Sequence, residues 1–248
     1  MITLYRPSGY DSPRASSFAG RSVDDKPLDV ENGSSFKEID TGRVFRYDKE
    51  NNLWIEQKST TGGAGATEPY IEETYDADGN LIGAKMYGYT KVRDYAFGNC
   101  TNLALTSLPA GVTSIGIEAF INCTNLALTS LPEGLTSIGD GAFTGCSNLA
   151  LTSLPAGVTS IGIEAFAGCS NLALTSLPAG VTSIGNSAFA GCSNLTSITF
   201  KGTPNAIAAN AFNGCTNLTD IKVPWAEGAV ANAPWGATNA TITYNYTE

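Results

Sequence analysis

Three groups of residues have types and spacing that could do chemistry: an Asp-Thr-Gly triplet, a short acidic stretch and a series of cysteines. Asp40-Thr41-Gly42 matches the core of an aspartic protease motif. That chemistry needs two carboxylates that share a proton, whereas the sequence contains one such triplet, followed by Arg43. We therefore interpret residues 40–42 as a turn between two short strands.

The acidic stretch offers a candidate calcium loop. Asp76, Asp78 and Asn80 have the spacing of the first ligands of such a loop. The usual loop ends with a bidentate glutamate at its twelfth position, and Tyr87 occupies that position here. A hairpin turn is therefore the favoured interpretation of residues 76–80, with weak calcium binding by these three side chains as the alternative.

The six cysteines follow one another at intervals of 23 residues: Cys100, Cys123, Cys146, Cys169, Cys192 and Cys215. A zinc site needs four ligands that converge on one point, but a regular repeat places its cysteines in a line. Stacked neighbours would lie about 4.8 Å apart with parallel Cβ directions, which is poor disulfide geometry. We expect free thiols that pack as small hydrophobic side chains, with zinc or disulfides as less favoured alternatives. No cofactor is predicted.

The composition excludes several classes of function. The chain of 248 residues contains no histidine, which removes Ser-His and Cys-His nucleophile systems and histidine metal sites. The formal net charge is −9, and no Lys or Arg lies in 100–200, so a nucleic-acid partner is not expected. No apolar run approaches the ~20 residues of a membrane span, and the first residues lack the apolar core of a secretion signal.

The cysteines belong to a longer repeat. A phenylalanine precedes each cysteine by three residues, and a leucine follows each cysteine by three. A period of 23 residues is typical of one coil of a solenoid, in which each column of side chains stacks on itself. The predicted core contains the columns Phe120, Phe143, Phe166, Phe189, Cys123, Cys146, Cys169 and Cys192.

Each coil is predicted to contain two strands and a helical turn. In the coil that follows Cys100, residues 102–109 are the first strand, which Pro109 ends, and 112–116 are a shorter second strand. Residues 117–123 suit a helical turn that places a phenylalanine and a cysteine on one face.

The pattern AFxxCxxL…P…VTSIG resembles the BspA-type leucine-rich repeats over about residues 90–223. These repeats are common in bacterial surface proteins and in gut bacterial and phage proteins. The resemblance implies a mainly β, right-handed leucine-rich-repeat solenoid with a binding or display role.

The first strand departs from the family pattern in four coils. The usual strand has apolar residues three and five positions after its leading leucine, as in 195–200 and 218–223, but four earlier coils read LALTSL. Either the extra leucines form an exposed ladder for a partner, or a bulge turns them inward and stacks the threonines outside. We favour the inward alternative, because an exposed leucine ladder invites aggregation. The candidate binding-face columns are therefore Thr106, Thr129, Thr152, Thr175, Leu105, Leu128, Leu151 and Leu174.

Composition divides the chain into five parts. The predicted parts are a small antiparallel β meander at 1–58, a flexible linker at 59–66, a hairpin and N-terminal cap at 67–99, repeats at 100–223 and a C-terminal cap at 224–248. The meander is predicted from strands at 36–40, 43–48 and 53–56. Trp225 and Trp235 are expected to cover the last coil, and 241–246 to form a closing strand.

The string GRSVDDKP…ENGSSFKEIDTGRVFRYDKENNLWIE, at about 20–57, resembles a short segment of tail and other structural proteins of phages and prophages. We therefore predict a non-enzymatic binding or display protein of a virion, which binds a host or bacterial surface protein or glycan and attaches to other phage proteins through residues 1–58. The alternative is a bacterial surface adhesin, and a glycan hydrolase is a distant third hypothesis, because no convergent carboxylate pair is visible. The expected location is a virion or cell surface.

Overall fold

The computed structural model describes residues 69–247 and five strands that precede them. It divides into two compact units, one of residues 1–70 and 75–81 and the other of 71–74 and 82–248. The linker predicted at 59–66 and the triplet at 40–42 lie outside the described residues. The division of the chain into five parts stays a prediction.

The first unit contains a five-stranded sheet in the order β1-β2-β3-β4-β5. Its strands are β1 (Thr3–Tyr5), β2 (Ser17–Gly20), β3 (Ser35–Glu38), β4 (Val44–Asp48) and β5 (Leu53–Gln57). The antiparallel pairing of β3, β4 and β5 confirms the three predicted strands. A wholly antiparallel meander is wrong, because β2 pairs with β3 in parallel.

A two-stranded sheet follows, formed by β6 (Tyr70–Tyr75) and β7 (Leu81–Tyr87). The turn between the strands closes through a backbone hydrogen bond of 3.0 Å from Asp76 N to Asn80 O. This arrangement confirms the hairpin predicted after residue 67. The backbone of Ala104 then donates to Ile82 O at 3.0 Å, which joins the hairpin to the first coil.

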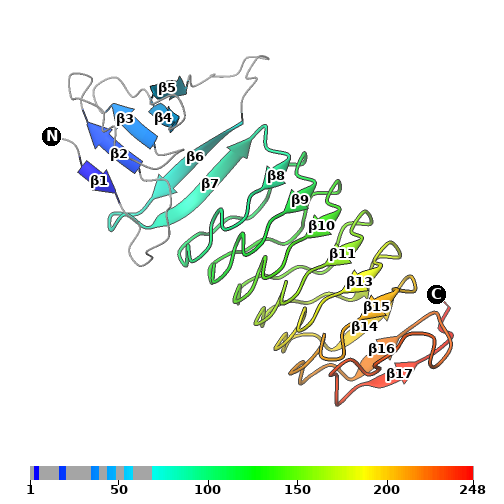
Figure 1. Ribbon diagram of the computed structural model, residues 1–248. Coiled ribbons are helices and arrows are strands. Elements are labelled where there is room, and N and C mark those ends of the chain that lie inside the picture. The colour runs from blue at the N-terminus through cyan, green and yellow to red at the C-terminus, as the bar shows by residue number, and fades with distance from the viewer. Residues whose placement is uncertain are drawn as a thin grey trace. The chain divides into compact units, whose positions relative to one another are not determined.

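The repeats stack through a six-stranded parallel sheet, which Figure 1 shows as a row of short arrows. Its strands are β8 (Lys91–Val92), β9 (Ser114–Ile115), β10 (Ser137–Ile138), β11 (Ser160–Ile161), β13 (Ser183–Ile184) and β15 (Ala206–Ile207). Each residue pairs with the residue one period away, as Ser137 does with Ser114 and with Ser160. The second predicted strand of each coil is confirmed, although it is only two residues long.

A second parallel sheet covers only the C-terminal coils. Its strands are β12 (Ser176–Leu177), β14 (Ser197–Phe200), β16 (Asp220–Lys222) and β17 (Thr241–Thr243). The first strand predicted at 102–109 is therefore wrong for the early coils, where residues 103–109, 126–132 and 149–155 form no strand. Isolated backbone bonds replace the ladder there, such as Ala127 N to Leu105 O at 3.2 Å and Ala173 N to Leu151 O at 3.0 Å.

The predicted helical turn is also wrong. Residues 117–122 form consecutive turns, in which Ile121 N donates to Glu118 O and Cys123 N to Phe120 O. Glu118 and Asn122 have φ of 48° and 56°, a left-handed conformation that a right-handed helix does not contain. Intervening N–H groups bond to the next coil, as Phe120 N does to Ala142 O at 2.8 Å. The turns thus hold neighbouring coils together.

The core confirms the predicted phenylalanine column. The rings of Phe97, Phe120, Phe143, Phe166, Phe189 and Phe212 stack in sequence with centroid separations of 5.1–5.4 Å. All six rings are buried. Such parallel contacts add to the burial of apolar area, which is the main favourable term in folding.

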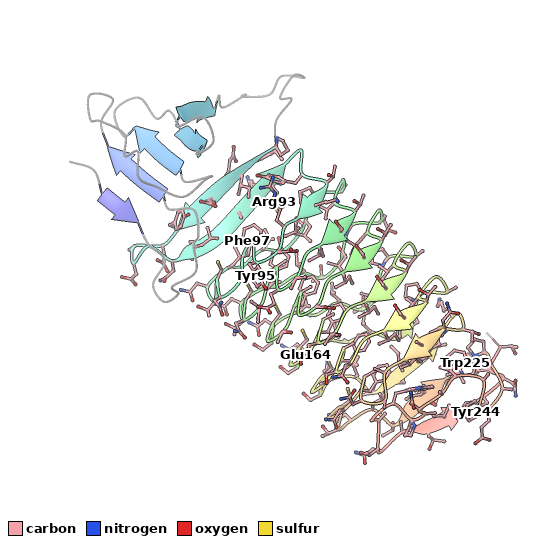
Figure 2. The ribbon with its side chains drawn as sticks, in the orientation of Figure 1. Arg93, Tyr95, Phe97, Glu164, Trp225 and Tyr244 are labelled. Carbon is pink, nitrogen blue, oxygen red and sulfur yellow. The ribbon has the colours of Figure 1, made fainter. Side chains whose placement is uncertain are left out.

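Two tryptophans close the C-terminal end of the array, as predicted. Trp225 and Trp235 are buried and pack against Phe200 with centroid distances of 5.3 and 5.9 Å. Figure 2 shows Trp225 at this end and Phe97 at the opposite end of the coils. The closing strand is β17, which pairs with β16 in parallel.

Within the part of the chain that the structure describes, no helix is long and apolar enough to cross a bilayer.

Candidate binding surfaces of the repeat array

The LALTSL segments present a threonine column, which consists of Thr106, Thr129, Thr152 and Thr175. All four threonines are exposed. The neighbouring Leu105 is 8% exposed, and the equivalent leucines of the next three coils are 0–2% exposed. The alternative with inward leucines and outward threonines therefore holds. The leucines Leu105, Leu128, Leu151 and Leu174 are wrong as candidate binding-face residues, because they pack in the core.

The threonine column offers hydroxyl groups in a segment with few charges. Each hydroxyl can donate one hydrogen bond and accept two. Segment 100–200 carries only four charged side chains, those of Glu118, Glu133, Asp140 and Glu164. The arrangement suits uncharged polar ligands, and it repeats once per coil.

Threonines beside the six-stranded sheet use their hydroxyls differently. Thr136 Oγ1 donates to Thr113 O at 3.0 Å, and Thr182 Oγ1 donates to Thr159 O at 3.0 Å. These hydroxyls therefore already bond to the backbone of the preceding coil. They stabilise the stack and are poor candidates for ligand contacts.

A shallow groove runs along the six-stranded sheet, and we call it the axial groove. Its volume is about 480 Å³. One side is formed by a serine column, the floor by a glycine column and the other side by the residues that follow the glycines. The residues that matter here are Ser137, Ser160, Ser183, Gly139, Gly162, Gly185, Ile117, Asp140 and Ile163.

The glycine column has a steric cause. A Cβ atom at Gly139 would lie 2.7 Å from the carbonyl carbon of Gly116, and one at Gly185 would lie 2.6 Å from the nitrogen of Ile163. Real Cβ atoms do not approach backbone this closely. At these glycines the neighbouring coil lies too close for a side chain, and the missing side chains leave the floor of the groove open.

The six cysteines form a line, and none of them forms a disulfide. Five of them are buried as predicted, whereas Cys100 in the first coil is only half-buried. Each buried thiol donates to the phenylalanine carbonyl 26 residues upstream, as Cys146 Sγ does to Phe120 O at 3.0 Å. Burial raises the pKa of the Cys146 thiol to about 12. A buried, protonated thiol is a poor nucleophile and a poor metal ligand, so the column is structural.

The calcium candidate at 76–80 is a turn that the Asp76 carboxylate stabilises. Asp76 Oδ1 accepts from the backbone N–H groups of Asp78 at 3.0 Å and Asn80 at 2.8 Å. Asp76 Oδ2 accepts from Asn80 Nδ2 at 2.9 Å. The hairpin-turn interpretation is confirmed. Among the described residues, no three Cys, Asp or Glu side chains gather closely enough to hold a metal ion.

Sequence reasoning missed the axial groove. The position after each VTSIG-type strand reads Asp94, Ile117, Asp140, Ile163 and Asn186 in successive coils. The alternation of isoleucine and aspartate can be seen in the sequence, but the exposure of the isoleucine side chains cannot. Ile117 is 41% exposed and Ile163 is 47% exposed.

Comparisons with known proteins agree with the repeat geometry. A family model described as a BspA type leucine rich repeat region matches six copies over residues 90–219. A leucine-rich repeat protein from Bacteroides ovatus ATCC 8483 is 28% identical, with a TM-score of 0.50, over 61% of this chain and 45% of its own. The chain therefore spans less than half the length of that protein. No curated protein matches.

Two further solved structures are similar in sequence. The T. pallidum leucine-rich repeat protein is 29% identical over 62% of this chain and 81% of its own, with a TM-score of 0.48. A leucine-rich cell surface protein from Faecalibacterium prausnitzii A2-165 is 26% identical over 64% of this chain and 58% of its own, with a TM-score of 0.30.

Proposed function

The chain belongs to the BspA-type leucine-rich repeat family, and from this premise we propose that it is a non-enzymatic binding protein. Its repeat array recognises a protein or glycan on a host or bacterial surface. Solenoids of stacked repeats typically provide extended binding surfaces and not catalytic sites.

The observation that carries this proposal is the threonine column. Its four hydroxyl groups lie outside, while the leucines beside them lie inside. An exposed, uncharged and repeated side chain suits a ligand that is itself extended or repetitive.

Near-identity of the coils supports the same function. Residues 146–168 and 169–191 differ at only two positions, where Ile163 and Glu164 become Asn186 and Ser187. Copies of one weak site on a rigid array gain avidity without any new contact. The array is thus suited to dense surfaces that carry many copies of a ligand.

The test compares two double variants of the full chain. Thr129→Ala/Thr152→Ala removes two hydroxyls of the threonine column, and Thr136→Ala/Thr159→Ala is the matched control beside the six-stranded sheet. Binding of the labelled chain to bacterial and epithelial cells and to a glycan array should fall about tenfold in the first variant. It should stay within about twofold in the control. Equal binding by both variants would remove the threonine column from the site.

The setting of this function is a virion tail or a bacterial surface. The virion alternative is supported by the resemblance of residues 20–57 to phage tail proteins, with residues 1–58 as the attachment module. The neighbouring genes separate the two settings, because tail and baseplate genes beside this one would favour the virion. Co-purification of the full chain with tail proteins would then test the attachment role.

A further inference from the structure

The axial groove has an alternating side wall. Ile117 and Ile163 are exposed two coils apart, and Asp140 lies between them in the intervening coil. Exposed isoleucines that occur singly need no explanation. These two are different, because they stand in one row along one groove with an open backbone floor.

The spacing of the isoleucines selects a ligand conformation. Parallel strands are about 4.8 Å apart, so residues two coils apart are separated by about 9.6 Å. A polyproline II helix rises about 3.1 Å per residue with three residues per turn. Side chains at every third position therefore share one face and repeat at about 9.3 Å.

Other backbone conformations match this spacing less well. In a β-strand, residues three positions apart point to opposite faces. An α-helix returns to one face after seven residues, which is about 10.5 Å. A polyproline II segment that runs along the solenoid axis is the closest match, and each of its apolar side chains would meet one isoleucine.

The charge of the groove favours one type of ligand residue between the apolar positions of the ligand. Asp140 Oδ1 accepts the Ile163 N–H at 2.8 Å, which fixes this carboxylate beside the row of isoleucines. Glu118 and Glu164 directly follow the two isoleucines in the chain, and segment 100–200 has no Lys or Arg. Figure 2 shows Glu164 on the surface of the coils. Anionic polymers are therefore disfavoured, and a cationic side chain between two apolar ones is favoured.

The ends of the groove set its length. At the N-terminal end, Lys91 pairs with Ser114 and so occupies the serine column, and Arg93, two residues later, occupies the glycine column. At the other end, Ala206 pairs with Ser183, and Ala208 then replaces the glycine. The open floor spans the four coils between these positions, at Gly116, Gly139, Gly162 and Gly185.

We propose that the axial groove binds a polyproline II segment of a partner protein, with an apolar side chain at every third position and Lys or Arg between. This rests on the proposed function and names a class of partner for the array. It also assigns a second surface, separate from the threonine column. The segment lies across the strands, its apolar side chains pack against Ile117 and Ile163, and the cation between them faces Asp140.

The test uses a fluorescein-labelled peptide of four Leu-Pro-Lys triplets and the full chain, with fluorescence anisotropy as the readout. The peptide should bind saturably, and its affinity should fall as salt screens the charges. Three control peptides should bind at least about tenfold more weakly. One has Glu in place of Lys, one has the same composition with leucines spaced two and four residues apart, and one is helical with leucine at every seventh position.

Variants of the chain locate the contact. Ile117→Ser/Ile163→Ser should weaken binding of the Leu-Pro-Lys peptide about tenfold. Asp140→Asn keeps an oxygen that can accept the Ile163 N–H but removes the charge, so it should weaken binding about threefold and flatten the salt dependence. Asn148→Ala/Asn171→Ala, on exposed residues outside the groove, is the control and should bind as the parent chain does.

Several results would overturn the proposal. These are no binding of the Leu-Pro-Lys peptide, equal binding of any control peptide, or unchanged binding by the double serine variant. Light scattering tests one further result that would overturn the proposal. If the parent chain forms a dimer and the double serine variant does not, the groove binds a second copy of this chain. If cell binding still depends on Thr129 and Thr152 in any of these cases, the proposed function stands without this inference.

Discussion

The early and late coils share the stacked phenylalanine and cysteine columns, which we call the spine. They differ in the segment after the leading leucine. In both regions the phenylalanine rings stack with nearly constant spacing and the cysteines lie beside them. In the late coils, Ile198 and Phe200 of β14 face inward and the strand pairs on both sides. In the early coils, Leu151 faces inward one position sooner, and no strand forms at 149–155.

The difference shows how one position changes a strand. Alternate residues of a strand point to opposite faces, so inward residues at positions three and five after the leucine keep a regular pleat. Inward leucines at positions zero, two and five cannot all belong to one pleat. The backbone must bulge, which leaves Thr152 and Ser153 both exposed. The array loses ladder hydrogen bonds there and gains a row of hydroxyls.

The largest expected effect comes from the part that both regions share. Phe143→Ala should lower the free energy of unfolding by about 3–5 kcal/mol, the usual cost of truncating a buried phenylalanine. Its ring stacks on two neighbours at 5.4 Å each, so the cavity cannot collapse easily. Urea denaturation followed by circular dichroism measures the loss. A cost below about 1 kcal/mol would mean that the spine contributes little and that the sheets hold the coils together.

The spine was predictable because the spacing of its residues is the same in every coil and does not depend on the local backbone conformation. Phe and Cys stand three residues apart in every coil, and a period of 23 residues stacks each on its copy whatever the turn between them. The tryptophan cap was predictable for a similar reason, since a large apolar side chain just past the last repeat has an open coil end to cover.

The next prediction separates the two strand patterns. Leu151→Ser should cost about 3 kcal/mol, because it leaves a cavity and buries a hydroxyl. Adding Thr152→Ile gives this coil the apolar spacing of 195–200, in which Ile198 is buried. The double variant should therefore recover about 1–2 kcal/mol of the loss as the isoleucine enters the core.

Thr152→Ile alone is the control for this pair, and it should recover nothing, because Leu151 already fills the site. If the double variant is no more stable than Leu151→Ser, the bulge is fixed by something other than the position of the leucine. The comparison between early and late coils would then need another cause.

Two features of the coil could not be read from residue types. The segment at 117–123 has the composition of a helical turn, but Glu118 at φ 48° and Glu164 at φ 54° adopt a conformation that glutamate seldom takes. Hydrogen bonds to the next coil impose it, such as Glu118 N to Asp140 O at 2.8 Å. The axial groove escaped prediction for the same reason, because its open floor depends on how closely the coils stack.

A third prediction uses the buried thiols of both regions. Burial raises the pKa of the Cys146 thiol to about 12 and of the Cys215 thiol to about 11, from an ordinary value of 9.0. Above pH 9 the unfolded chain releases these protons while the folded chain keeps them. Stability should therefore be full below pH 9 and fall as pH rises, by up to about 1.4 kcal/mol per pH unit for each thiol.

Urea denaturation at pH 8, 9 and 10 measures this slope. Cys146→Ala should lower the free energy of unfolding at every pH. Above pH 9 it should also make the decrease of that free energy with pH less steep, by the contribution of one thiol. Other groups that titrate there, such as lysines and tyrosines, are unchanged in the variant and cancel in the difference. A slope that the substitution leaves unchanged would mean that this thiol is already accessible in the folded chain.

The smallest effect is expected at the exposed side of the early coils. Thr152→Ala should change the free energy of unfolding by less than about 1 kcal/mol, because the side chain is exposed and its loss leaves no cavity. Its neighbour Leu151 is fully buried, so two adjacent residues should differ severalfold in their effect. A loss at Thr152 as large as that at Leu151 would place the threonine inside and return the leucines to the surface. The threonine column would then be part of the core, and a partner would meet a ladder of leucines in its place.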